Sequence, residues 1–88
     1  MIYTKIYIGS DNVSKVLDVE RIHALLLKYT EGYTLTRATC SWKGSREDVA
    51  IVEVYSDIFD AMDFVAEAKI TLRQDSIMVV SSNVDVTF

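Results

Sequence analysis

The sequence predicts one α+β domain with the element order strand, helix, strand, strand, helix, strand. The chain has 88 residues, which is enough for one modest hydrophobic core. Half of the residues are hydrophobic and none is proline, a composition typical of dense regular structure. Two segments with helical spacing of apolar residues lie among four segments rich in β-branched and aromatic residues. We therefore expect residues 1–88 to form a single domain.

The first strand and the first helix are predicted by a change in the spacing of apolar residues. From Ile2 to Ile8, side chains alternate between an apolar and a more polar set, as a strand with one core face requires. A turn-forming run at 9–12 ends this strand. From Val19 to Tyr29 the apolar residues are three and four positions apart, which predicts a helix with Asp18 or Ser14 as its N-cap.

A hairpin is expected after this helix. Gly32 suits the left-handed residue that follows a helix end. Residues 33–42 are rich in threonine, aromatic and β-branched side chains, and 43–46 supply a turn. A second strand is expected from Asp48 to Tyr55, antiparallel to the first.

The second helix is predicted to begin at Asp57, which can act as its N-cap. Lys69 and Arg73 lie near its expected C-terminal end, where positive charge favours the helix dipole. Residues 74–75 close the helix, and 76–80 begin the last strand.

This order is the split βαβ, or ferredoxin-like, arrangement, an antiparallel sheet with both helices on one face. In 49–55 and 77–80 both alternation phases are apolar, so the face without helices should carry a larger patch than soluble monomers usually expose. We expect the chain to associate through that face; the alternative is that the C-terminal segment folds over it. The expected members of the patch are Ile51, Tyr55, Ile77, Val79 and Tyr7.

Charge and cysteine content exclude several classes of function. Nine basic and thirteen acidic residues give a net charge of −4, which repels phosphate backbones and argues against nucleic-acid binding. The one cysteine allows no internal disulfide, and no cysteine–histidine cluster is present to hold a metal. No apolar run approaches the roughly 20 residues of a membrane span, and no signal peptide is recognised. We expect a cytoplasmic protein with no membrane partner.

Local motifs add little on their own. Residues 6–10 resemble the first-strand motif of RNA-recognition domains, but 47–53 lack the basic residue, glycine and aromatics of the partner motif. His23 and Cys40 have no companions at a catalytic or metal-binding spacing. Neither residue is therefore expected to be catalytic.

The predicted hairpin turn is the richest candidate site. Residues 38–47 gather an aromatic, a glycine, hydroxyls and a carboxylate around one turn. Two interpretations remain open at this point. One is a ligand site; the other is a solvated hairpin with Glu47 paired to Arg46 or Lys43.

Residues 39–47 resemble the Gly-x-aromatic turn followed by glutamate of phage-encoded S-adenosylmethionine lyases. The second predicted helix and the last strand, 57–80, are similar to the same family, so the resemblance covers about 33–80. Cys40 departs from the family pattern, which has glycine there. The resemblance implies a homotrimer of PII-like, ferredoxin-fold subunits with active sites between subunits, in the host cytoplasm if the chain is phage-encoded.

The implied reaction is intramolecular: the carboxylate of S-adenosylmethionine attacks its own γ-carbon and expels methylthioadenosine, which leaves homoserine lactone. No metal, cofactor or protein nucleophile is implied, and catalysis consists of folding the substrate and excluding water. The resemblance places Glu47 as the carboxylate that holds the substrate's cationic part. Trp42, Ser10 and Tyr7 are expected to line the pocket for this adenosine-containing ligand.

A noncatalytic alternative is a small protein that binds a nucleotide-like ligand or inhibits a partner protein. The environment of Glu47 separates the two: a lyase needs this carboxylate in a dry pocket between subunits, whereas a binder or inhibitor can leave it on an exposed hairpin.

Overall fold

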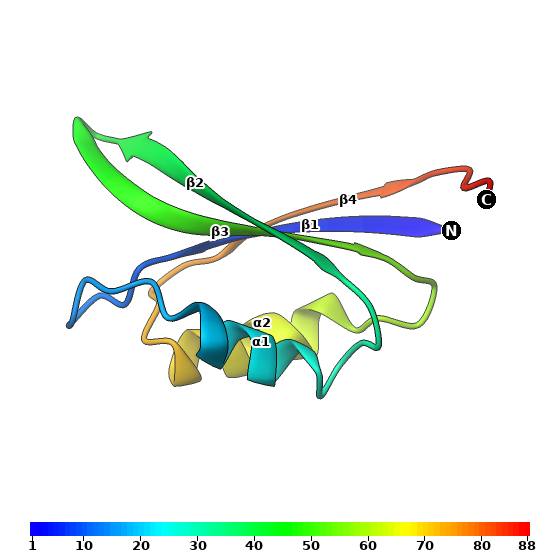
Figure 1. The fold of residues 1–88 in the computed structure, drawn as a ribbon, viewed down its shortest axis with the longest axis horizontal. Helices are drawn as coiled ribbons and strands as arrows, with labels where there is room; N and C mark the ends of the chain where they lie inside the picture. Colours follow the sequence, from blue (N-terminus) through cyan, green and yellow to red (C-terminus); the bar gives the residue numbers. More distant parts are fainter.

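The computed structural model describes residues 1–88 apart from the side chain of Trp42, and has a four-stranded antiparallel sheet and two helices. Both helices lie on one side of the sheet (Figure 1). The sheet order is β2-β3-β1-β4, so β1 and β3 are central and β2 and β4 are edges. The predicted α+β class and element order are confirmed, and the arrangement is compatible with a ferredoxin-like fold. The elements are β1 (Ile2–Gly9), α1 (Val19–Leu26), β2 (Thr34–Trp42), β3 (Ser45–Tyr55), α2 (Ala61–Thr71) and β4 (Met78–Asn83).

The core lies between the sheet and the helices. Ile6 and Ile8 on β1 are fully buried, whereas Tyr3 and Tyr7, which belong to the other alternation phase of the strand, are only half-buried. Phe64 on α2 is the largest fully buried side chain among those that the structure describes. The predicted alternation of β1 is therefore confirmed. The other large side chains that are fully buried are Ile22, Leu26, Val52 and Val54.

The first helix begins at Val19, directly after one of its two predicted N-caps, Asp18. Its carboxylate accepts a hydrogen bond from the Arg21 backbone N–H at 3.0 Å, so Asp18 and not Ser14 is the N-cap. The helix ends at Leu26, and turns cover the next three residues. Gly32 is therefore too far along the chain to cap it, and that expectation was wrong.

The second helix begins later than predicted. Asp60 is its N-cap, because the Asp60 carboxylate accepts from the Asp63 N–H at 3.0 Å. Asp57, the predicted cap, instead accepts from the Ile2 N–H at 3.1 Å. The β3–α2 connection thus uses its first aspartate to hold the start of β1 and its second to start the helix.

The hairpin turn is tight, which lengthens β3. Lys43 and Gly44 are its two central residues, with φ of 50° and 79°, and Trp42 pairs with Ser45. Two successive residues with positive φ are the feature of the type I′ hairpin turn, whose twist matches that of the strands. β3 therefore starts at Ser45, three residues before the predicted start, and the hairpin tip extends past the helices (Figure 1).

The sheet face without helices, called the open face below, differs in part from the prediction. Ile6 pairs with Val79 and Tyr7 with Met78, so Val79 faces the core and Met78 the open face. Val79 and Ile77 pack partly against the core, and their assignment to the patch was wrong. Tyr7, Ile51 and Tyr55 do share the open face, as the register of β1 with β3 requires. The half-exposed side chains there include Tyr55 (53%), Met78 (57%) and Val80 (45%).

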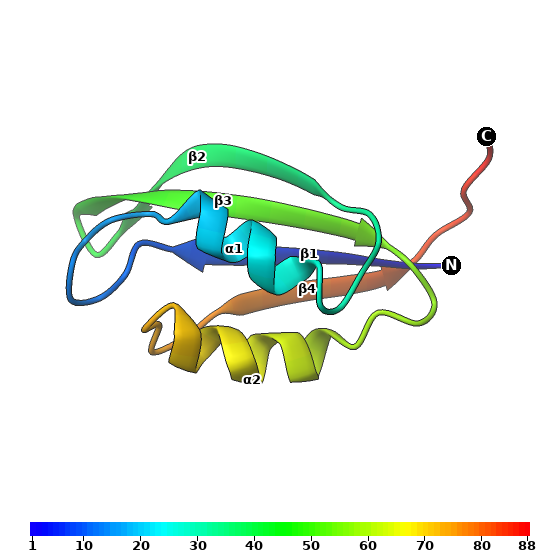
Figure 2. The ribbon, with the colours of Figure 1, turned by 60° about the horizontal axis from the view of Figure 1, so that its bottom comes forward.

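The C-terminal segment does not cover this patch. Its first residue, Val84, donates a backbone hydrogen bond to the Met1 carbonyl at 2.9 Å, which continues the β1–β4 edge. Figure 2 shows the last residues leaving the sheet beyond β4. No described helix is both long enough and apolar enough to cross a bilayer.

Candidate functional site

A cleft lies between the end of β1 and the start of β3. Its volume is about 680 Å³, within the roughly 300–1,000 Å³ common for ligand sites. Two of the predicted site residues, Ser10 and Glu47, line it together. The other lining residues are Asn12, Lys15, Thr39, Ser45, Arg46 and Asp48.

Ser10 joins three segments of the chain at this cleft. Its backbone N–H donates to Glu47 Oε1 at 2.9 Å, and its hydroxyl donates to the Asp48 carbonyl at 2.9 Å. Its carbonyl accepts from Gln74 Nε2, which comes from the α2–β4 connection. Ser10 is only 8% exposed, so each of these bonds satisfies a group that water reaches poorly. The predicted pocket residue is thus first of all a fixed support for Glu47.

Glu47 is anchored through one oxygen only. Oε1 accepts from Ser10, and no described side chain or backbone group donates to Oε2. The residue is exposed in the single chain, and the described ion pairs do not join it to Arg46. One carboxylate oxygen is therefore available to a ligand while the other fixes the position of the group.

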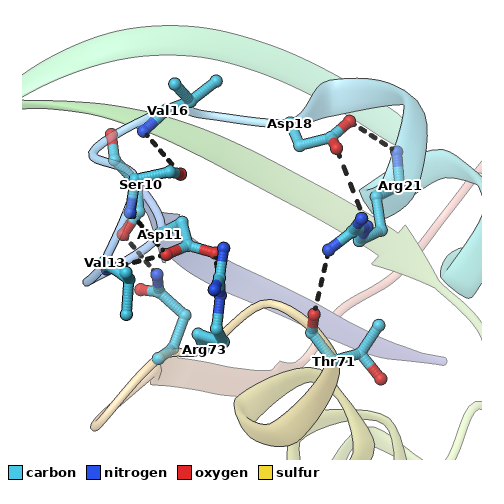
Figure 3. A network of polar contacts seen from close by, with 10 residues as sticks. Ser10, Asp11, Val13, Val16, Asp18, Arg21, Thr71 and Arg73 are labelled. Atoms are coloured by element: carbon cyan, nitrogen blue, oxygen red, sulfur yellow. Dashed lines mark hydrogen bonds and ion pairs between the residues drawn. The ribbon is translucent and has the colours of Figure 1, made fainter.

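Asp11 and Arg73 brace the loop behind Ser10 (Figure 3). Asp11 Oδ1 accepts from the N–H groups of Val13 at 2.7 Å and Ser14 at 3.0 Å, and Oδ2 meets Arg73 Nε at 2.5 Å. Burial raises the pKa of Asp11, but these hydrogen bonds and the Arg73 charge lower it more, so the pKa lies below its usual value. The Asn12 N–H also donates to the Arg73 carbonyl, at 3.2 Å.

These contacts tie the β1–α1 and α2–β4 connections together at one end of the sheet. A second, smaller cleft of about 220 Å³ lies beside this brace, and Arg21, one of its lining residues, donates to the Thr71 carbonyl at 3.5 Å (Figure 3). All described polar side-chain atoms that are buried have a hydrogen-bond partner. The loops around the first cleft are therefore held in place before any ligand arrives.

The other two predicted pocket residues do not line the cleft with Ser10. Tyr7 lies on the open face with the Lys5 ammonium 5.3 Å from its ring centre, and it is not among the cleft residues. The backbone of Trp42 ends β2 beside the turn, and its side chain lies outside the described part of the chain. The single chain thus brings together two of the four predicted site residues.

Three residues that hold the site were not assigned to it from the sequence: Asp11, Arg73 and Gln74. Gln74 and Ser10 are 64 positions apart, and only the pairing of β1 with β4 brings them together. A signal was present in the strand order, since the end of β1 and the start of an antiparallel β4 must lie at the same end of the sheet. Polar residues at both places were candidates for contact.

The β2 strand accepts Cys40 without distortion. The β2–β3 ladder is continuous from Thr34 to Trp42, and Cys40 pairs directly with Glu47. Cys40 is therefore a cross-strand neighbour of the anchored glutamate.

The charges of the cleft are mixed. Lys15 and Arg46 bring positive charge, and Glu47 and Asp48 bring negative charge. No group of three or more histidine, cysteine or acidic side chains in the described part of the chain is arranged to hold a metal. The cleft is thus suited to an organic ligand that carries both positive and negative groups. A scan of protein-family models and a search of curated proteins found no match to this chain.

Proposed function

We propose that this chain is a ferredoxin-like subunit of a homotrimer that cleaves S-adenosylmethionine to methylthioadenosine and homoserine lactone at sites between subunits. The strand order β2-β3-β1-β4 and the two helices on one face support the fold assignment. The half-exposed apolar and aromatic side chains of the open face support association. The motif resemblance over 39–47 supports the reaction.

One observation carries the proposal: the Glu47 carboxylate is held by Ser10 through Oε1 at the edge of a ligand-sized cleft, and Oε2 takes no part in that bond. A sulfonium ion offers no hydrogen to a hydrogen bond, so a fixed carboxylate oxygen is a suitable partner for it through charge alone. Because the anchor is a backbone N–H from a buried residue, the carboxylate needs little reorganisation when substrate binds.

The reaction needs no proton transfer from the protein. In the substrate, a carboxylate oxygen forms a bond to the γ-carbon while the bond from that carbon to sulfur breaks, and the electron pair of the broken bond stays on sulfur. The charges of the carboxylate and the sulfonium cancel as the products form. Water around the substrate carboxylate opposes this step, so a dry pocket that folds the substrate accelerates it.

A second subunit has to exclude water from the site. Glu47 is exposed in the single chain, and the cleft opens toward solvent. A neighbouring subunit packed at the open face would cover this end of the sheet. Tyr7 lies on the same face, so this contact would also bring a Tyr7 side chain toward the ligand. The exposure of Glu47 in one chain is also the observation that favours the noncatalytic alternative, in which the cleft only binds a ligand.

The test is a comparison of wild type with Glu47→Gln. Glutamine keeps the shape and an oxygen that can accept from Ser10, but it removes the charge that holds a sulfonium. We expect methylthioadenosine production to fall about 30-fold to 1000-fold, which corresponds to roughly 2–4 kcal/mol. Glu31→Gln is the matched control, because Glu31 is exposed on the connection before β2 and lies near Tyr55 and Ser56, at the other end of β3 from Glu47, so activity should not change.

The outcomes separate the two functions. Equal rates for wild type and Glu47→Gln would show that Glu47 has no part in the reaction. If wild type produces no methylthioadenosine but binds S-adenosylmethionine in calorimetry, and Glu47→Gln binds it more weakly, the noncatalytic function is the correct one.

A further inference from the structure

Gly9 is the last residue of β1 and pairs with Val49 of β3. Its side-chain position belongs to the open face, in line with Tyr3, Lys5 and Tyr7. The backbone does not require glycine there, because Gly44 is the one glycine of the chain with positive φ. The reason for glycine at position 9 must therefore lie in its surroundings.

Those surroundings are side-chain atoms of the candidate site. A Cβ added at Gly9 would lie 3.0 Å from Glu47 Cδ, 3.1 Å from Gln74 Oε1, and well inside contact distance of Glu47 Oε1. The Glu47 carboxylate thus occupies the space that any other residue at position 9 would fill. Both conflicting groups are the ends of flexible side chains, so a Cβ would displace them without forcing the strand apart.

We infer that Gly9 is a positioning residue for Glu47: its missing side chain is what allows the carboxylate to lie over the end of β1 and accept the Ser10 N–H. The 2.9 Å bond from Ser10 depends on this close approach. A larger residue would move the carboxylate away and leave the poorly exposed Ser10 N–H without its partner.

The consequence for activity rests on the proposed function. If Glu47 holds the cationic part of the substrate, a displacement of about 1 Å can cost on the order of 100-fold in rate. Gly9→Ala should then act through Glu47, although alanine itself touches neither substrate nor product.

A double-mutant cycle tests the placement without any assay of activity. The variants are Gly9→Ala, Glu47→Ala and both together, compared by thermal unfolding at one fixed chain concentration. With Glu47 present, Gly9→Ala should lower Tm by about 4–8 °C, the shift expected when a domain of this size loses one such hydrogen bond. With Glu47→Ala, the same substitution should be neutral or raise Tm, since alanine in a strand is favoured over glycine.

Gly32→Ala is the matched control. Gly32 has no positive φ, and a Cβ there would meet nothing within 4 Å. This substitution should leave Tm unchanged or slightly raised and leave activity as in wild type, so a general effect of replacing glycine by alanine is measured separately.

The activity arm uses methylthioadenosine formation from S-adenosylmethionine. Gly9→Ala should lower kcat/KM by about 10-fold to 100-fold, and the double variant should be no less active than Glu47→Ala alone. Additive losses in both arms would overturn the inference, because Gly9 would then act independently of Glu47.

Remaining outcomes are also decisive. If Gly9→Ala fails to fold but the double variant folds, the conflict with Glu47 is demonstrated; if neither folds, Gly9 is needed for another reason and the inference is wrong. If wild type has no lyase activity, the proposed function fails, while the Tm cycle still decides the role of Gly9.

Discussion

At the scale of single residues, two tyrosine hydroxyls each donate to a glutamate. Tyr3 donates to Glu53 at 2.6 Å on the open face, and Tyr29 donates to Glu67 at 2.7 Å beside the helices. These hydrogen bonds, together with burial and the carboxylate charge, raise the pKa of Tyr3 and of Tyr29 to about 12. The folded protein therefore binds these two protons more tightly than the unfolded chain.

We predict a late alkaline titration for two of the five tyrosines. A raised folded pKa gives stability that is complete below the unfolded pKa, near 10, and is lost as pH rises toward 12. Absorbance at 295 nm should show two groups titrating near pH 12 in wild type and one in Tyr3→Phe. Titration of all tyrosines together near pH 10 would contradict the Tyr3–Glu53 and Tyr29–Glu67 bonds.

Asp11 gives the corresponding prediction in acid. Its pKa is lowered, so its contribution to stability is complete above the unfolded pKa of about 3.9 and is lost as pH falls through the lower folded pKa. Asp11→Ala should lower Tm strongly at pH 7 and much less at pH 2. The control is Asp75→Ala, which removes an exposed carboxylate from the nearby α2–β4 connection and should leave Tm almost unchanged at both pH values.

Single residues also show how much of the candidate site could be predicted from the sequence. The motif at 39–47 placed Glu47 beside the hairpin turn, the expected position of Ser10 in space placed it in the pocket, and the structure brings these two together. Gln74 and Arg73 could not be assigned, because their partners Ser10 and Asp11 are more than 60 positions away. Such contacts depend on which strands are neighbours, a property of the whole sheet.

At the scale of elements, the start of α2 offers a direct test. Asp60→Ala should lower the free energy of unfolding by about 1 kcal/mol, because it removes the N-cap acceptor of the Asp63 N–H. Asp57→Ala should cost less, about 0.5 kcal/mol or under, because its bond to the Ile2 N–H is exposed. Urea unfolding of the two variants gives the ranking, and the reverse order would contradict Asp60 as the cap.

The elements were predictable where one local signal was sufficient. A period of two placed β1, and the glycine-containing turn predicted at 43–46 placed the β2–β3 hairpin, in which Trp42 pairs with Ser45. The sequence could not predict which side chains near the start of β4 face the helices, because residues 77–80 are apolar in both alternation phases. Only pairing with β1, which sets Ile6 opposite Val79, decides which of them face the helices.

At the scale of the whole molecule, the open face and the cleft are parts of one proposal. Tyr55, Met78 and Val80 are about half exposed on a sheet face that the rest of this chain leaves uncovered. If subunits pack there, the same contact excludes water from Glu47 at the sheet end. If they do not, the proposed reaction has no dry pocket.

Ile51→Asp tests that contact from within the face. Ile51 lies opposite Tyr7 near the middle of the open face, so each subunit would bring an unpaired charge into the interface, at a cost of several kcal/mol. The variant should be folded but dissociated. Ile70→Asp is the matched control, because Ile70 is 81% exposed on α2 in the helical layer, and it should assemble as wild type does.

The molar mass of the wild-type protein in solution, measured by light scattering at micromolar concentration with these two variants alongside, tests the shared site most directly. We predict a mass near three times the 10.0 kDa chain mass for wild type and for Ile70→Asp, and near one chain mass for Ile51→Asp. A wild-type mass of one chain at that concentration would contradict both the interface on the open face and an active site between subunits.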